Sequence, residues 1–256
     1  MMQKFFLNVF VAISLLFPVV SWGAVSTITD DVANCSTADD VNENDAMSFC
    51  TWYFAASTVD GNDRFWQKTT SAGAESMLFY LSGTGSLSYA FQVNGSTNLI
   101  RLSATSTITA DTWEHVCVTW TGSTTATNVK FYKNGTETSY GSKTNGVTPT
   151  DNSGGTLYLF NRAAADRPWQ GYLSEYYFFD RVITAQEIAI LSQSKLKGVG
   201  LGMRPIRYYP LNEQEDGVAS NATYFDYGST GENCTGSNTP TGKAETVLNY
   251  PVGIVQ

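Results

Sequence analysis

Short apolar runs separated by turn-forming residues fill the chain from residue 24 to about residue 182. Runs with strand composition occupy residues 48–54, 77–81, 87–93, 98–102, 113–120, 129–133, 156–160 and 172–180. Asn-Gly pairs at residues 94–95, 134–135 and 145–146 lie between or beside these runs, and this dipeptide favours tight hairpin turns. Many short strands at such close spacing predict an antiparallel β-sandwich or barrel.

One helix interrupts this pattern, over residues 184–195. Thr184 is a suitable N-cap, and Glu187 follows three residues later, as in a capping box. After Lys197 the chain becomes rich in Gly, Asn and Thr and has too little apolar surface for a core of its own. We therefore divide the chain into a sandwich domain at 24–197 and a C-terminal extension at 198–256 that packs on it.

The first 23 residues have the pattern of a secretory signal peptide. Lys4 precedes an apolar run at 5–20, and Ser21 and Gly23 supply the small residues typical of a cleavage site. The alternative is a retained membrane anchor, but a spanning helix needs roughly 20 apolar residues and tolerates an internal proline poorly. We expect a protein that is secreted or held at the cell surface or in the periplasm, with membrane contact only through the signal segment.

Export bears on the four cysteines, because an oxidising compartment allows disulfides to form. Four cysteines can pair in three ways, and sequence alone does not choose among them. Cys50 and Cys117 lie in strand-like runs that neighbouring strands would bring together, and a Cys35–Cys234 bridge would close a long loop. We predict both pairs, with small buried thiols at Cys50 and Cys117 as the alternative for the first.

Charge excludes several classes of function. The formal net charge is -8 and no basic run is present, which argues against nucleic acid as a partner. A single histidine, His115, cannot build a His-rich metal site, and no Ser or Cys nucleophile motif accompanies it. We interpret His115 as part of strand packing, and we predict no catalytic residue.

Three longer segments occur in a characteristic order. Residues 47–54 read M-S-F-C-T-W-Y-F, residues 113–122 and 129–135 read W-E-H-V-C-V-T-W-T-G and V-K-F-Y-K-N-G, and residues 171–188 read G-Y-L-S-E-Y-Y-F-F-D-R-V-I-T-A-Q-E-I. In this order they resemble the laminin-G-like domains of the concanavalin A-like lectin/glucanase superfamily. The resemblance covers residues 25–196 and implies an all-β, two-sheet antiparallel jelly-roll sandwich with one short helix. It does not identify a ligand, because one sandwich carries many functions.

This chain departs from the family's patterns at two places that matter for hydrolysis and for calcium binding. Members that cleave β-glucans carry E-x-D-x-x-E on one strand, which places two carboxylates at one glycosidic bond, and this chain has no such string. Members also often hold structural calcium through an Asp at the position of Ser174, whose hydroxyl is a poor ligand for a hard cation. We therefore expect no hydrolase activity and assign no cofactor and no metal site. Loop carboxylates that leave other calcium sites open are Asp30, Asp31, Asp39, Asp40 and Asp166.

Such domains usually begin with a strand similar to Y-W-P-L-D-E-G. No match to it precedes residue 29 of this chain, but Y-Y-P-L-N-E occurs near the other end, at 208–213. Either this segment pairs beside residues 172–180, as in a permuted sandwich, or it opens a second, truncated copy. We favour the first, because an unpaired apolar edge is a liability in an exported protein.

Two polar–aromatic groups are candidates for a sugar site, since a pyranose stacks its C–H face on an aromatic ring while its hydroxyls need hydrogen-bond partners. The candidate ligand-binding residues are Arg64, Trp66, Asp166, Arg167 and Trp169. The alternative for Trp66 and Trp169 is packing in the core or at a sheet edge, and this is the alternative that we favour.

The expected function is non-catalytic recognition of glycans or glycoproteins by an exported protein. One alternative is a structural or assembly module of a cell surface or viral appendage that binds other protein chains. The other is a divergent glycoside hydrolase, which would need two carboxylates facing each other across a groove.

Overall fold

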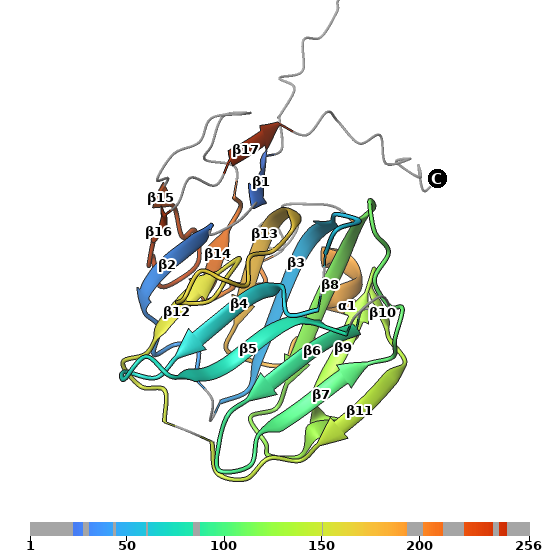
Figure 1. The fold of residues 1–256 in the computed structure, drawn as a ribbon, viewed down its shortest axis with the longest axis vertical. Helices are drawn as coiled ribbons and strands as arrows, with labels where there is room; N and C mark the ends of the chain where they lie inside the picture. The colour runs from blue at the N-terminus through green and yellow to red at the C-terminus, as the bar shows by residue number, and fades with distance from the viewer. Residues whose placement is uncertain are drawn as a thin grey trace, which may run out of the picture.

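The strands form two antiparallel sheets that pack face to face (Figure 1). A computed structural model describes residues 23–27, 31–42, 45–59, 61–83, 88–149, 151–193, 202–211, 223–237 and 241–244. The two-sheet, all-β sandwich expected from the sequence is confirmed. The predicted signal peptide lies outside the described residues apart from Gly23.

The sheet at the back of Figure 1 is called sheet A. Its strands are β1 (Gly23–Thr27), β3 (Met47–Ala55), β8 (Trp113–Trp120), β9 (Lys130–Lys133), β10 (Thr136–Glu137), β13 (Gly171–Phe179), β14 (Arg207–Tyr209) and β17 (Thr241–Ala244). They follow the order β10-β9-β8-β3-β13-β1-β17, and β14 pairs with β13 beside this path.

The sheet at the front is called sheet B. Its strands are β2 (Val32–Thr37), β4 (Arg64–Thr69), β5 (Glu75–Ser82), β6 (Ser88–Val93), β7 (Leu99–Ser103), β11 (Tyr140–Thr144), β12 (Thr156–Leu159), β15 (Thr223–Tyr224) and β16 (Cys234–Ser237). Their order is β11-β7-β6-β5-β4-β12-β2-β16-β15. A 3-10 turn at Ala126–Asn128 precedes β9.

Aromatic side chains fill the space between the two sheets, because alternate residues of each strand point inward. In β5, Phe79 and Leu81 are buried in the core, whereas Tyr80 between them is half-buried and faces outward. The ring of Phe49 in β3 lies 5.8 Å from that of Phe79 in β5 and 6.0 Å from that of Trp66 in β4. Contacts of this kind join the sheets across the core.

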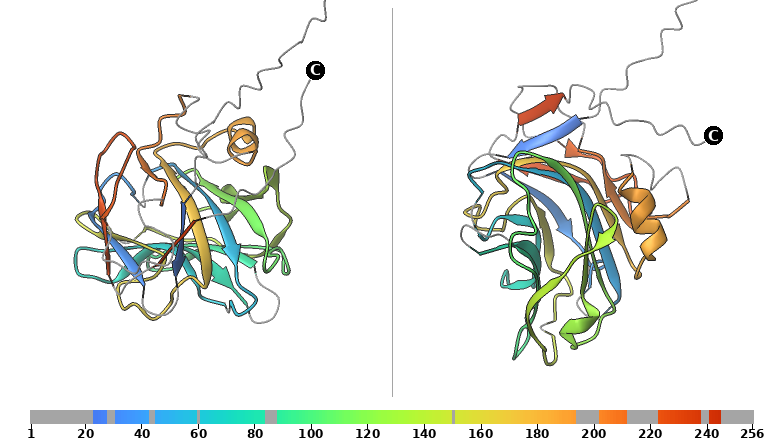
Figure 2. Two further views of the ribbon diagram at one scale, coloured as in Figure 1. Left: turned by 90° about the horizontal axis from the view of Figure 1, so that it is seen from above. Right: turned by 90° about the vertical axis from the view of Figure 1, so that its right-hand side faces the viewer.

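The outer face of sheet A is covered by α1 (Ala185–Leu191), which Figure 2 shows on the side of sheet A that faces away from sheet B. Ile188 and Leu191 pack with apolar residues of that face. The predicted capping box is present: Thr184 Oγ1 accepts from the Glu187 N–H at 3.2 Å, and the Glu187 carboxylate accepts from the Thr184 N–H at 2.7 Å. The helix ends at Leu191, earlier than predicted, and the N–H of the following Ser192 donates to the carbonyls of Ile188 and Ile190.

Both predicted disulfides are present. Cys50 and Cys117 are directly opposite each other on β3 and β8, so their bridge joins neighbouring strands of sheet A. The bridge between Cys35 and Cys234 joins β2 to β16 across a sequence separation of 199 residues. The second bridge therefore closes almost the whole sandwich into one covalent loop.

The segment that resembles a first strand pairs where we expected it. Tyr209 of β14 lies opposite Tyr176 of β13, and Arg207 lies opposite Phe178. The guanidinium of Arg207, whose side chain is only 1% exposed, donates from Nε and from Nη2 to the two carboxylate oxygens of Asp40, each at 2.6 Å. This pairing and this ion pair tie the C-terminal part of the chain into the sandwich, and the domain boundary at 197–198 stays a prediction.

Replacing Arg207 tests how much its ion pair with Asp40 contributes to the stability of the fold. Arg207→Ala leaves Asp40 partly buried without its cation, and we expect the free energy of unfolding to fall by about 3 kcal/mol. The control is Arg181→Ala, which removes a more exposed ion pair with Glu187 and is expected to cost about 1 kcal/mol or less. Urea denaturation measures both variants, and equal losses would contradict the role given to Arg207.

Candidate functional site

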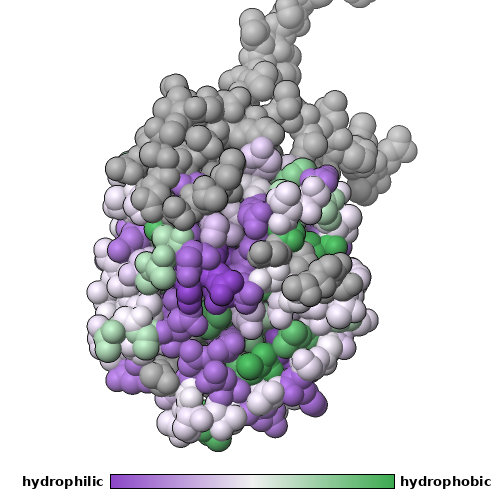
Figure 3. All heavy atoms as spheres, viewed as in Figure 1, coloured by the Kyte–Doolittle hydropathy of each residue, from purple (hydrophilic) through white to green (hydrophobic). Residues whose placement is uncertain are grey.

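A group of polar residues joins β4 and β5 to the loop after β12. Figure 3 shows a band of hydrophilic surface on the side of the molecule formed by sheet B. We call this group the Arg162 cluster, and its members are Arg64, Glu75, Tyr80, Arg162 and Asp166. Strand alternation explains why Tyr80 faces outward, since its neighbours in β5 face the core.

Arg162 holds the cluster together by contacting two carboxylates. Its Nε and Nη2 donate to Asp166, the second over 2.6 Å, and its Nη1 donates to Glu75 Oε1 over 3.2 Å. The same oxygen of Glu75 lies 3.7 Å from Nη2 of Arg64. The Arg64 guanidinium in turn lies over the Tyr80 ring, with Cζ 4.6 Å from its centroid. The cluster is thus a chain of alternating charges that runs from the loop after β12 to β4 and β5.

Asn161 shapes the loop that presents Arg162 and Asp166. Its side chain is fully buried, and its Oδ1 accepts the backbone N–H groups of Arg162 and Arg167, each at 2.8 Å. Its Nδ2 donates to the carbonyl of Asp31 at 3.0 Å. Because one amide side chain satisfies both ends of the loop, the loop is folded back onto the sheet face.

The structure brings three of the predicted ligand residues to this region. Arg64 and Asp166 belong to the cluster, and Arg167, which is half-buried in the same loop, accepts the Arg64 N–H on its carbonyl at 3.2 Å. Trp66 and Trp169 are fully buried in the core instead. A ring with no exposed surface offers no face to a sugar, so packing, the alternative that the sequence favoured, describes both. The ligand-binding role of the other three stays a prediction.

Three members of the cluster were not among the residues predicted from the sequence: Glu75, Tyr80 and Arg162. Arg162 has a signal in the sequence, because it stands four residues before Asp166 in a loop that also contains Arg167. Glu75 and Tyr80 have none, since they occupy ordinary strand positions whose direction depends on the register of β5.

The charge state of Asp166 bears on the chemistry of the site. Hydrogen bonds from Arg162 lower the pKa of Asp166, and 53% of its side chain is exposed. A general acid for glycoside cleavage needs a raised pKa instead. Asp166 therefore offers hydrogen-bond acceptors with a fixed charge to a ligand in solvent, and no proton at neutral pH.

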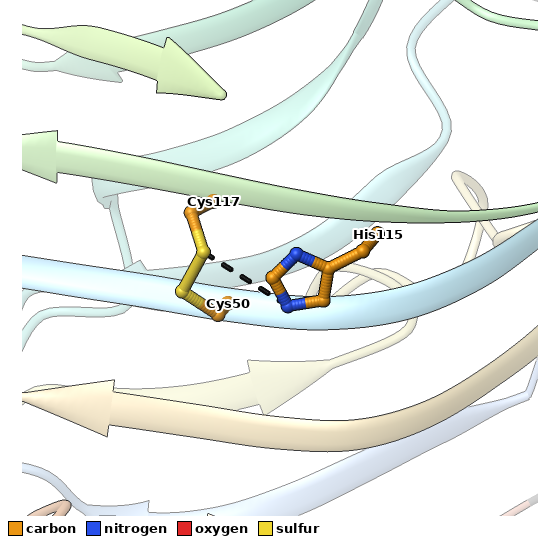
Figure 4. Close-up of side chains that lie close together, drawn as sticks. All are labelled: Cys50, His115 and Cys117. Carbon is orange, nitrogen blue, oxygen red and sulfur yellow. Dashed lines mark hydrogen bonds between the residues drawn. A yellow bond between two sulfur atoms is a disulfide. The ribbon is translucent and has the colours of Figure 1, made fainter. Parts of the chain in front are cut away.

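A second group of potential ligand atoms lies on the neighbouring strands β3 and β8 (Figure 4). Cys50, His115 and Cys117 have ligand atoms within 4.8 Å of one another. The two sulfurs are bonded to each other, so neither is the thiolate that binds metals. His115 Nε2 lies 4.0 Å from Cys117 Sγ, and burial lowers the pKa of His115 to about 3. We assign this group to packing, as expected for His115.

The calcium implied by the family resemblance does not fit the residues at its usual place. Ser174 is fully buried, and its carbonyl accepts the Thr51 hydroxyl at 2.9 Å. Two of the loop carboxylates considered above, Asp40 and Asp166, are bound by arginines. Asp39 accepts the Gly154 N–H at 2.6 Å, and Asp30 lies outside the described residues.

Known proteins share this fold. Residues 29–189 match the family model Laminin_G_3, described as the concanavalin A-like lectin/glucanases superfamily, in agreement with the resemblance found in the sequence. A putative carbohydrate binding protein from Bacteroides ovatus is similar, with a TM-score of 0.58 at 17% identity, over 89% of this chain and 61% of that one. A heptameric SAP-like pentraxin from Limulus polyphemus aligns with a TM-score of 0.46 at 16% identity, over 69% of this chain and 78% of that one. No curated protein sequence matches.

The protonation state of His115 predicts how the free energy of unfolding depends on pH. His115 is the only histidine, with a pKa of about 3 when folded and about 6.5 when unfolded, so between these values the unfolded chain binds the extra proton. Stability therefore falls as the pH is lowered below about 6.5, by up to roughly 1.4 kcal/mol per pH unit.

His115→Gln removes this titration, and we expect the variant to have a flat stability profile between pH 7 and pH 5.5 in urea denaturation. The wild-type protein should lose stability over the same interval, where the carboxylates contribute little. A wild-type slope that persists in the variant would contradict the assignment.

Proposed function

Because the chain belongs to the concanavalin A-like lectin/glucanases superfamily, we propose that it is a non-catalytic carbohydrate-binding protein whose site is the Arg162 cluster. The observation that carries the proposal is the cluster itself, in which charged hydrogen-bonding groups lie beside an outward-facing tyrosine. Sugar hydroxyls need directed donors and acceptors, and a sugar's C–H face needs an apolar surface.

The side chains of the cluster are accessible to different degrees. Those of Arg162, Glu75 and Asp166 are 28%, 32% and 53% exposed. An ionised carboxylate has about four lone-pair positions, so each acid keeps acceptor capacity after binding Arg162. Tyr158 of β12 is half-buried and lies opposite Gln67 of β4, so a second ring borders the same face. A glycan would meet fixed acceptors next to the Tyr80 ring, one side of which is covered by Arg64.

The environment of the acids supports a binding role over hydrolysis. Both carboxylates contact one guanidinium, which fixes their places on the sheet. Arg162 also lowers the pKa of Asp166, whereas glycosidases raise the pKa of one carboxyl so that it protonates the leaving group. We therefore favour binding, and the experiment below also tests the alternative of a divergent hydrolase.

We place this binding activity outside the cytoplasm. Two disulfides are typical of proteins that fold in an oxidising compartment. The apolar run at residues 5–20 is the sequence feature that would direct export. Within the described residues, no helix has both the length and the apolar character needed to cross a membrane.

A glycan array followed by calorimetric titration of the best ligand tests the site. Arg162→Ala releases Glu75 and Asp166 from their shared donor, and we expect it to weaken binding at least tenfold, or about 1.4 kcal/mol. The matched control is Lys130→Ala, which breaks an exposed ion pair with Glu137 on sheet A and should leave the affinity unchanged.

Three results would contradict the proposal. Equal affinities of the two variants would remove the Arg162 cluster as the site. New reducing ends in the incubated ligand would replace binding by hydrolysis. A silent array from a protein that self-associates in solution would favour the assembly module.

A further inference from the structure

A hollow lies in the part of the chain that follows α1, beyond the residues matched by the family model. The described residues that line it are Gly202, Arg204, Pro205, Tyr227, Gly228 and Ser229. Its volume is about 290 Å³, close to the lower limit of about 300 Å³ for small-molecule sites. A hollow of this size suits one ring-sized group.

Tyr227 is the feature of the hollow that points to a ligand. The residue is 60% exposed, the highest value among the large hydrophobic residues that the structure describes. One side of its ring contacts the Tyr208 ring at 6.3 Å, and Tyr208 is stacked on Tyr177 at 4.6 Å with an angle of 9° between the rings. Tyr227 is therefore the solvent-facing end of a row of rings that begins on the covered face of sheet A.

Asp226 fixes the loop that carries this ring. Its Oδ1 accepts the backbone N–H groups of Tyr208 and Gly228, each at 2.7 Å. Its Oδ2 accepts the Thr230 hydroxyl at 2.6 Å and the Glu232 N–H at 3.0 Å. Four bonds to one carboxylate order the loop before any ligand arrives, which lowers the entropy lost on binding.

Gly228 shows how closely this loop lies against the chain before β14. A Cβ atom at this position would stand 2.4 Å from the carbonyl oxygen of Ile206. The Tyr227 N–H also donates to the Tyr208 carbonyl at 2.8 Å, and the Ser229 N–H donates to the Pro205 carbonyl at 3.2 Å. Both walls of the hollow are thus held together by backbone contacts.

The charge at the hollow comes from Arg204. This residue is exposed and has a left-handed backbone, with φ at 50°. Among the described residues that line the hollow, Arg204 is the only charged one.

We propose that this hollow binds one carboxylated sugar residue, with Tyr227 stacked on the apolar face of its ring and Arg204 paired with its carboxylate. An aromatic ring selects the flat C–H face of a pyranose, and a guanidinium matches the geometry of a carboxylate. The choice of a sugar rests on the proposed function, whereas the place of the site rests on the hollow alone. The site is separate from the Arg162 cluster, which lies on the outer face of sheet B.

Titration with a trimer of galacturonic acid, and with the neutral galactose trimer as a comparison, tests the proposal on the full mature chain. We expect the wild-type protein to prefer the acidic trimer. Tyr227→Ala should weaken binding of the acidic trimer at least tenfold, while Tyr227→Phe, which keeps the ring, should retain it. Arg204→Gln should lower the preference for the acidic trimer several-fold and reduce its dependence on salt.

Two control variants separate this site from the rest of the molecule. Phe225→Ala removes another exposed aromatic residue of the same segment that does not line the hollow, and should bind as the wild type does. Lys130→Ala, which changes an exposed residue of sheet A outside both proposed sites, should also leave binding of the acidic trimer unchanged.

The proposal is overturned if the wild-type protein does not bind the acidic trimer, or if Tyr227→Ala binds it normally. If Arg162→Ala abolishes glycan binding and Tyr227→Ala does not, the proposed function stands and this inference fails. If Tyr227→Ala alone abolishes it, the hollow is supported and the Arg162 cluster loses its role.

Discussion

Sheet A is apolar on both of its faces, and the arrangement of the rest of the chain follows from this property. In β3 every residue except Phe54 is buried. One face of the sheet meets sheet B, so the other needs a cover, which α1 and Met203 supply. Burial beneath that cover also accounts for the neutral state of His115, since a charged imidazole there would lose its hydration.

Local patterns made most of the fold predictable. The strand runs and the capping box of α1 could be read from residues close together in the sequence, whereas the pairing of β14 was inferred from the family resemblance. The correct pairing scheme of the four cysteines, one of three possible schemes, was also predicted. Cys50 and Cys117 lie in strands that are neighbours in this fold, which leaves Cys35 to pair with Cys234.

The site was less predictable, because it depends on register. Trp66 illustrates the difficulty: strict alternation would send Phe65 and Trp66 to opposite faces, but the pairing of β4 with β5 shifts between Arg64 and Trp66. Both rings consequently face the core, and Arg64 is left on the outer face beside Tyr80. A one-residue irregularity of this kind leaves no clear mark in the composition of the strand.

The bridge between Cys35 and Cys234 has a consequence for the durability of the protein. The segment of chain between these two residues contains nearly all the strands of both sheets, and it also contains the Cys50–Cys117 bridge. A single protease cut in any loop between Cys35 and Cys234 opens this ring but releases no fragment, because the two pieces remain covalently joined. A protein exposed to extracellular proteases would thus keep its parts together after being nicked.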